Sequence, residues 1–360
     1  MSAFVTGATG FIGRHLMERL LARGGAVHVL VREGSQRRLE ALVRAWGHPH
    51  RVHPLVGDLS RPRLGLGRAG IDRLRGQVDH LFHLAAVYDM TADEQRNRLA
   101  NVDGTRHAVQ LGNALEVRCF HQVSSVAAAG MYRGAFREDM FDVGQPLEHP
   151  SHATKFASER IAREETATPW RVYRPAVVVG DSRTGEMDKV DGPYLFFRLL
   201  RAGSRLPSWL PLIAPDLGDT NVVPVDFVAD AIDVLAHREG LDGRAFHLCN
   251  PEPQPSVEVL NAFARVAGAP RVVASVGGRP AAWAVTRGAQ ALARVPVAGV
   301  PVRALLASAG IPAEVLAYLG FTARFDTTAT EQALAGSGVR VPTLDSYAQR
   351  LWDYWEANLR

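Results

Sequence analysis

The chain has 360 residues, of which 47% are hydrophobic, 22% charged and 8% aromatic, a composition typical of a globular protein with one or two ordinary domains. Its 41 Lys and Arg residues nearly balance its 37 Asp and Glu residues, for a formal net charge of +4. Because the two signs are interspersed, a nucleic-acid-binding function is disfavoured. Cys119 and Cys249 show no metal-binding or redox spacing, so we expect reduced thiols in a cytoplasmic protein.

Two features invite a membrane or metal interpretation that the sequence disfavours. The apolar segment 281–310 is interrupted by three arginines and two prolines, so it is not expected to span a bilayer, although weak contact with a membrane surface remains open. His48, His50 and His53 lie among prolines and an arginine, which favours a surface loop over a metal site. The sequence starts directly with a strand pattern, so we expect no signal peptide.

Residues 1–35 have the pattern of a strand, a glycine-rich turn, an amphipathic helix and a second strand. The turn contains Gly7, Gly10 and Gly13 in a G-x-x-G-x-x-G spacing. Because glycine has no side chain, the backbone there is able to approach a pyrophosphate at the N-terminus of the helix. The sequence therefore predicts a dinucleotide site formed by these glycines together with Thr9, Phe11 and Ile12.

The end of the second strand distinguishes the two nicotinamide cofactors. An acidic residue there binds the ribose 2′-hydroxyl of NAD(H), whereas a basic residue accommodates the 2′-phosphate of NADP(H). Here the strand ends in Arg32, followed by Ser35, Arg37 and Arg38. Because an arginine fork suits phosphate, NADP(H) is favoured. The alternative, a solvated helix start, fits Arg37 or Arg38 better than Arg32.

Two further strands are predicted over 52–60 and 79–89. Each ends in residues expected to contact the cofactor, Asp58 and Leu59 at the adenine ring and the small Ala85 and Ala86 where room is needed.

A helix over 98–115 and a strand over 119–130 follow. Ser124 and Ser125 stand at the carboxyl end of that strand, where open α/β sheets bind ligands. A serine pair after a strand is otherwise an ordinary turn, so the position carries this prediction.

The chain resembles the extended short-chain dehydrogenase/reductases over nearly its whole length. The resemblance rests on TGATGFIG, GDLS, FHLAA, NVDGT, VSSVAAAG, SHATKFASE, VYRPAVVVGDS and NVVPVDFVADAI. On residues 171–197 and the tail 341–360 it is similar to the thioester and fatty acyl-CoA reductase branch, whose members often belong to larger multidomain chains. The resemblance implies an α/β fold, with a Rossmann-type doubly wound parallel sheet and a smaller, mostly C-terminal α/β substrate domain.

The resemblance also implies the roles of individual residues. Ser125 would orient the substrate carbonyl, and Lys155 would hold the nicotinamide ribose and lower the pKa of a tyrosine one helical turn earlier. Pro175 and Val178 would line the nicotinamide end. The tyrosine position is occupied by Ser151, whose aliphatic hydroxyl is far less acidic than a phenol with a pKa of about 10.

Three interpretations of Ser151 are open. It disables an otherwise intact enzyme, in which case the lost general acid is worth about 10²–10⁴-fold in rate. Alternatively, the chemistry has diverged and another group or a water carries the proton, Tyr88 and Tyr132 being better placed than His152, which points about 100° around the helix from Ser151. The third interpretation is a noncatalytic NADP-binding module.

The second half is expected to shape the substrate site. Residues 1–180 are assigned mainly to the cofactor domain and 181–360 mainly to the substrate region, with 216–250 returning to the Rossmann sheet. The residues expected at the substrate, besides Ser125, are Tyr88, Met131, Met187 and Tyr194. We expect hydride transfer from NADPH to a hydrophobic acyl thioester or aldehyde. The alternative is a dehydrogenase, epimerase or lyase acting on a nucleotide sugar or a steroid-like substrate.

Overall fold

The computed structural model describes residues 1–85, 99–188, 192–215, 218–276 and 321–359. The chain folds into two compact units, each built from separate stretches of sequence. Unit 1 comprises Met1–Ala176, Val225–Cys249 and Phe325–Arg340, and unit 2 comprises Val177–Pro224, Asn250–Arg324 and Val341–Arg360.

Unit 1 contains a seven-stranded sheet in the order β12-β7-β5-β4-β1-β2-β3, in which every neighbouring pair is parallel. Its strands are β1 (Ala3–Thr6), β2 (Val27–Val31), β3 (Val52–Val56), β4 (His80–His83), β5 (Cys119–Val123), β7 (Trp170–Pro175) and β12 (Arg244–Leu248). The strand order reverses between β1 and β4, which is where doubly wound folds bind their ligands. The predicted Rossmann-type α/β fold is confirmed.

The burial of the strands follows their place in the sheet. All residues of β1 and β5 are buried, as expected for central parallel strands covered by helices on both faces. The edge strand β3 is largely exposed and contains Pro54, which is tolerated there because one side of an edge strand needs no hydrogen-bond donor.

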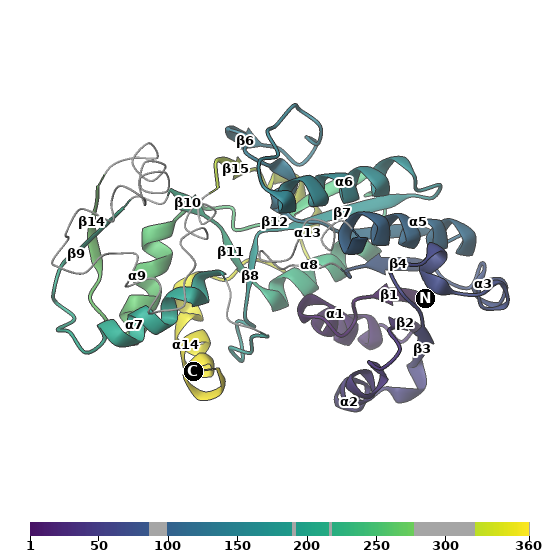
Figure 1. The fold of residues 1–360 in the computed structure, drawn as a ribbon, viewed down its shortest axis with the longest axis horizontal. Coiled ribbons are helices and arrows are strands. Elements are labelled where there is room, and N and C mark those ends of the chain that lie inside the picture. Colours follow the sequence, from purple (N-terminus) through teal and green to yellow (C-terminus); the bar gives the residue numbers. More distant parts are fainter. Residues whose placement is uncertain (86–98, 189–191, 216–217, 277–320, 360) are drawn as a thin grey trace. The chain divides into compact units, whose positions relative to one another are not determined.

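Helices cover both faces of the sheet (Figure 1). The helices of unit 1 are α1 (Phe11–Ala22), α2 (Gln36–Trp46), α3 (Arg68–Leu74), α5 (Gly104–Leu115), α6 (Pro150–Glu164), α8 (Val225–His237) and α13 (Thr328–Leu334). One face carries α5 and α6, whose Leu111, Leu115 and Ile161 pack in one cluster with Phe4 and Phe120 of the sheet. The other face carries α1 and α8, joined by ion pairs that begin at Arg19 and Arg23.

Unit 2 is assembled around two helices, α9 (Ser256–Ala267) and α14 (Ala348–Asn358), together with α7 (Phe197–Gly203). Its short strands pair as β8 (Val177–Val179) with β11 (Val222–Pro224), β9 (Leu212–Pro215) with β14 (Val272–Val276), and β10 (Asp219–Thr220) with β13 (Gln254–Pro255). Phe197, Phe263, Trp352 and Trp355 lie in its buried core. Leu351 of α14 is fully buried, so the tail helix packs into this unit, as its apolar spacing predicts.

No helix in the described ranges combines the length and hydropathy that a bilayer crossing requires. The apolar segment 281–310 lies outside those ranges.

Candidate active site

The glycine turn after β1 brings three backbone segments into close contact. Gly7 has φ 76°, a conformation that side chains disfavour, and a Cβ there would lie 2.7 Å from the amide nitrogen of Ala85, just beyond β4. At Gly13 a Cβ would lie 2.0 Å from the carbonyl oxygen of Gly7. Both glycines are therefore required so that α1 and the end of β4 are able to pack against the turn.

The N-terminus of α1 fits a bound pyrophosphate. Its N-cap residue is Gly10, no side chain caps it, and its first turn, which includes Phe11 and Ile12, contains no acidic residue. The first N–H groups of a helix have no partner within the helix, and together with the helix dipole they attract anions. A backbone cradle with these properties suits the phosphates of a dinucleotide.

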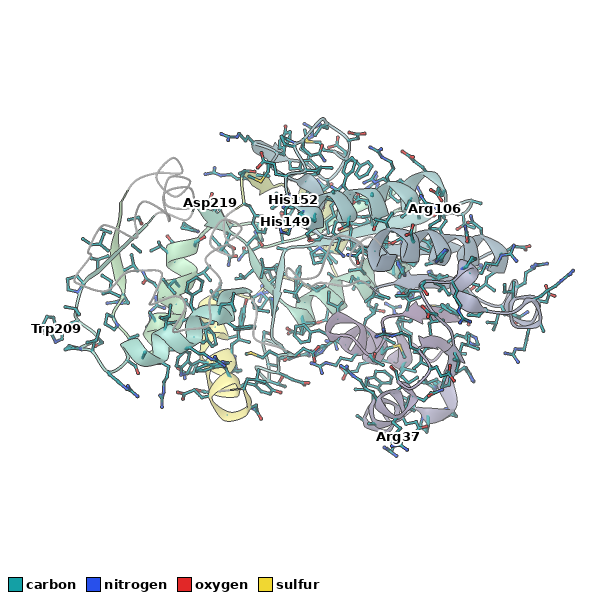
Figure 2. All side chains as sticks on the ribbon, viewed as in Figure 1. Arg37, Arg106, His149, His152, Trp209 and Asp219 are labelled. Atoms are coloured by element: carbon teal, nitrogen blue, oxygen red, sulfur yellow. The ribbon has the colours of Figure 1, made fainter. Side chains whose placement is uncertain are left out.

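The residues predicted at the adenosine end gather around the ends of β2 and β3. Arg32 is exposed directly after β2, and Arg38 Nη2 donates a hydrogen bond to the carbonyl oxygen of Thr9 at 3.0 Å. Ser35 is the N-cap residue of α2, and Arg37 projects at the edge of unit 1 (Figure 2).

Asp58 and Leu59 follow β3, and both already have internal partners. Asp58 Oδ1 accepts hydrogen bonds from the amide and the hydroxyl of Ser60, each at 2.8 Å, and these bonds lower the pKa of the carboxyl. The carbonyl oxygen of Leu59 bonds to His107 Nδ1 at 2.7 Å.

Ser125 and Ser124 stand at the carboxyl end of β5 and face different partners. Ser125 begins the short helix η4 (Val126–Ala129), and its Oγ accepts a hydrogen bond from the amide of Ala127 at 3.2 Å. Because a hydroxyl also carries a donor, Ser125 retains a proton to offer to a carbonyl oxygen. Ser124 Oγ instead donates to Glu159 Oε2 at 3.0 Å, in the buried interior.

The first turn of α6 contains Ser151 and places Lys155 one turn later, on the same helix face. His149 is the N-cap residue, and its Nδ1 accepts a hydrogen bond from the amide of Ser151 at 3.1 Å. His149 and His152 lie side by side with ring centroids 5.7 Å apart (Figure 2). Burial lowers the pKa of His152 to about 4, so this imidazole is neutral near pH 7.

Lys155 is buried, with 7% of its surface exposed. Burial lowers the pKa of its ammonium from 10.5 to about 8. Within the described ranges its side chain has no hydrogen-bond or carboxylate partner.

His83, at the end of β4, anchors a network that the sequence analysis missed. Its two ring nitrogens bond to Thr6 Oγ1 at 2.8 Å and Thr105 Oγ1 at 3.2 Å. The Thr105 hydroxyl also donates to the carbonyl oxygen of Asn101 at 2.6 Å, and Ser158 Oγ of α6 donates to the same oxygen. Burial, and then the charge of Lys155, lower the pKa of His83 to about 3. The FHLAA and NVDGT motifs were the available signal for these residues.

A second buried network fixes α6 against β7. Arg174 and Glu159 are both fully buried and approach to 2.6 Å. Burial alone would raise the pKa of Glu159, but Arg174 and Arg163 hold it below its usual value. This ion pair anchors the helix that holds Ser151 and Lys155.

The remaining predicted residues are distributed over both units. Pro175 is buried at the end of β7, and Met131 is partly buried after η4. Val178 is partly buried in β8 of unit 2, and Met187 and Tyr194 lie in the core cluster of that unit. The Tyr194 hydroxyl accepts a hydrogen bond from the amide of Gly180 at 2.6 Å. Ala86 and Tyr88 lie outside the described residues.

Comparison with known proteins gives a consistent assignment. The family model described as "Male sterility protein" matches residues 5–232. A linear gramicidin synthase of Brevibacillus parabrevis is 32% identical over 268 residues, which cover 69% of this chain and 5% of that protein. A carboxylic acid reductase of Segniliparus rugosus is 28% identical over 286 residues, which cover 69% of this chain and 24% of that protein. The chain thus spans only a small part of either relative.

Among solved structures, the terminal R domain from the myxalamid PKS-NRPS biosynthetic pathway superposes with a TM-score of 0.77 at 24% identity, covering 99% of this chain and 90% of that one. This likeness shows the fold. Taken with the match over residues 5–232, it means that the chain belongs to the male sterility protein family, a group of extended short-chain dehydrogenase/reductases with an NAD(P)-binding Rossmann domain.

Proposed function

We propose that the chain is an NADPH-dependent reductase of a hydrophobic acyl thioester or aldehyde. The observation that carries the proposal is that one unit combines a glycine turn suited to a dinucleotide with Ser125 and Lys155, which follow from the same parallel sheet. Open α/β sheets bind their ligands at the carboxyl ends of the strands, where Ser125 stands.

Each residue has a role that its environment supports. The first turn of α1 would hold the pyrophosphate, Arg32 and Arg38 the 2′-phosphate, and Lys155 the nicotinamide ribose. When bound, the cofactor supplies a hydride to the carbonyl carbon of the substrate. Ser125 would donate a hydrogen bond to the carbonyl oxygen, which stabilises the negative charge that develops there.

The thioester and aldehyde classes are favoured over others by the relatives. One relative is named a carboxylic acid reductase and another a linear gramicidin synthase, and the chain spans a small part of each. We infer that the chain works as a reductase module on an acyl group bound through sulfur. The apolar residues after position 191 would contact the acyl chain.

Product analysis tests this function. The purified chain is incubated with NADPH and a panel of acyl-CoA thioesters, aldehydes and nucleotide sugars, and the products are identified by mass spectrometry. We expect NADPH oxidation with release of free thiol and aldehyde from the thioester. Turnover of a nucleotide sugar alone would favour the epimerase or dehydrogenase alternative. Tight NADPH binding without turnover of any substrate would favour a binding module.

A matched variant separates site chemistry from folding. Ser125→Ala removes the donor to the carbonyl oxygen while the backbone of η4 is retained. We expect turnover to fall about 10²–10³-fold, the usual worth of one oxyanion donor, with unchanged NADPH affinity.

A further inference from the structure

We propose that Lys155 is itself the proton donor of this site and that Ser151 leaves the room it needs. The inference rests on the reductase function proposed above and assigns its proton step. It gives Lys155 a catalytic role in addition to binding the cofactor ribose.

The geometry of α6 supports this role. Ser151 and Lys155 share one face of the helix, one turn apart. A serine side chain ends at its hydroxyl, whereas a phenol at the same position would extend across the space in front of the lysine. Within the described ranges, Ser151 Oγ has no hydrogen-bond partner that would hold it in that space.

The charged groups packed around α6 leave the lysine without a counter-charge. On α6 itself, Glu159 pairs with Arg163 and Arg174. Asp103 and Glu165 pair with Arg106 of α5.

The neighbouring strands contribute neutral groups to this surrounding. His121 of β5 and Tyr173 of β7 bond to each other, and η4 contains only apolar residues. His83 of β4 senses the charge of Lys155 but is held neutral by burial. His149 and His152 have lowered pKa values for the same reason.

An ammonium in such a place is a usable acid near neutral pH. Burial lowers the pKa of Lys155 to about 8, and general acids are most effective when their pKa lies near the working pH. An aliphatic hydroxyl such as that of Ser151 has no comparable acidity.

The Lys155 ammonium gives up its proton as the hydride arrives. While the new C–H bond forms, the carbonyl oxygen takes this proton and the ammonium becomes a neutral amine. In the thioester case the resulting hemithioacetal loses its hydroxyl proton to that amine while the C–S bond breaks and the thiolate leaves. The thiolate takes a proton from solvent. The net reaction consumes one NADPH and one proton and gives an aldehyde, a thiol and NADP⁺.

The first test measures the lysine without cofactor or substrate. The chain contains two lysines, Lys155 and Lys189, so incorporation of lysine labelled with ¹³C at Cε gives two NMR signals, and Lys189→Arg assigns them. We expect the Lys155 signal to titrate with a midpoint near 8, which supports the proposal. A midpoint near the ordinary value of 10.5 would overturn it.

The second test uses Lys155→Arg, which retains a cation for the ribose but has a pKa above about 12 and cannot release its proton. We expect NADPH affinity to stay within threefold, kcat at pH 7.5 to fall at least about 100-fold, and the decline in rate above pH 8 to disappear. The control is Arg160→Lys on the exposed face of α6, which should change neither quantity.

The outcomes separate this inference from the function on which it rests. If the unmodified chain oxidises NADPH but shows no decline in rate near pH 8, or if Lys155→Arg keeps more than a tenth of kcat, the proton-donor role is wrong and the reductase function stands. If the unmodified chain turns over neither thioesters nor aldehydes, both proposals fail.

Discussion

Arg38 Nη2 donates a hydrogen bond to the carbonyl oxygen of Thr9 at 3.0 Å, which connects the start of α2 to the glycine turn. Arg32 lies exposed six residues earlier, at the end of β2, so it is free to meet a phosphate. We expect NADPH to bind at least about tenfold more tightly than NADH, a difference of about 1.4 kcal/mol. Arg32→Ala should remove most of this difference, as measured by calorimetric titration.

The control for this change is Arg68→Ala on α3, where the guanidinium is 95% exposed. It should leave both affinities unchanged. Equal affinities of the unmodified chain for NADPH and NADH would contradict the cofactor assignment.

The proposed acyl substrate leads to a prediction about thermal stability. Because a ligand that binds only the folded state raises the melting temperature, acyl compounds with long chains should protect the NADP⁺-bound protein more than short polar carbonyl compounds do. Differential scanning fluorimetry over a chain-length series measures this. Greater protection by a nucleotide sugar would favour the alternative substrate class.

The cofactor half of the site was predictable from sequence because its signals are local. The glycine spacing, the strand before it and the helix after it lie within one short stretch, and α6 likewise places Ser151 and Lys155 by simple helical spacing. The network around His83 was not predictable, because its partner Thr6 is 77 positions away in sequence. Only the pairing of β1 with β4 brings them together.

The substrate residues illustrate a different limit. Met187 and Tyr194 follow a strand end and lie near glycine and proline, a pattern equally compatible with a pocket and with a core. The structure places both in the buried cluster of unit 2, where Tyr194 also fixes the backbone at Gly180. A pattern of large apolar residues does not distinguish contact with a ligand from contact with another helix.

Buried histidines predict loss of stability in acid. His80, His121 and Tyr173 form a hydrogen-bonded chain in the interior of unit 1. Burial lowers the pKa of His80 to about 4, and that of His83 and His247 to about 3. Since the unfolded chain binds these protons more readily, the stabilisation is fully present above pH 6.5 and is lost as the pH falls from 6.5 towards 3.

The melting temperature should therefore fall steeply between pH 6.5 and pH 4, as followed by circular dichroism. His80→Phe should make this decline shallower, whereas His50→Gln, at an exposed position, should leave it unchanged. A constant melting temperature over this range would show that the histidines are not buried in the neutral form.

The buried ion pair of Glu159 and Arg174 predicts a large stability effect. Arg174→Met removes the guanidinium that contacts Glu159 at 2.6 Å and also bonds to the carbonyl oxygen of Met140. Breaking a buried pair leaves an uncompensated charge and costs about 3–5 kcal/mol. Arg160→Met, whose pair with Asp142 is exposed, should cost under about 1 kcal/mol. Urea unfolding measures both, and similar costs would contradict the assigned burial.

Ser151→Tyr tests the three interpretations of the serine. If Lys155 already donates the proton, the phenol adds a donor where one exists, so kcat with an acyl-CoA or aldehyde should change less than tenfold. The new side chain should instead alter the pH at which the rate declines, because a phenol beside an ammonium titrates differently from the ammonium alone. NADPH affinity should be unchanged, because the glycine turn and Arg32 lie on other elements.

The alternatives give different results in the same assay. A rise of about 10²–10⁴-fold, the usual worth of a positioned general acid, would mean that the serine disables an otherwise complete site and that Lys155 is no adequate donor. A tyrosine variant that folds, binds NADPH and still turns over no carbonyl compound, like its parent, would indicate a binding module. The serine and tyrosine forms compared from pH 6 to pH 10 therefore distinguish a lysine donor, a disabled enzyme and a noncatalytic protein, because only the first predicts similar rates with different pH profiles.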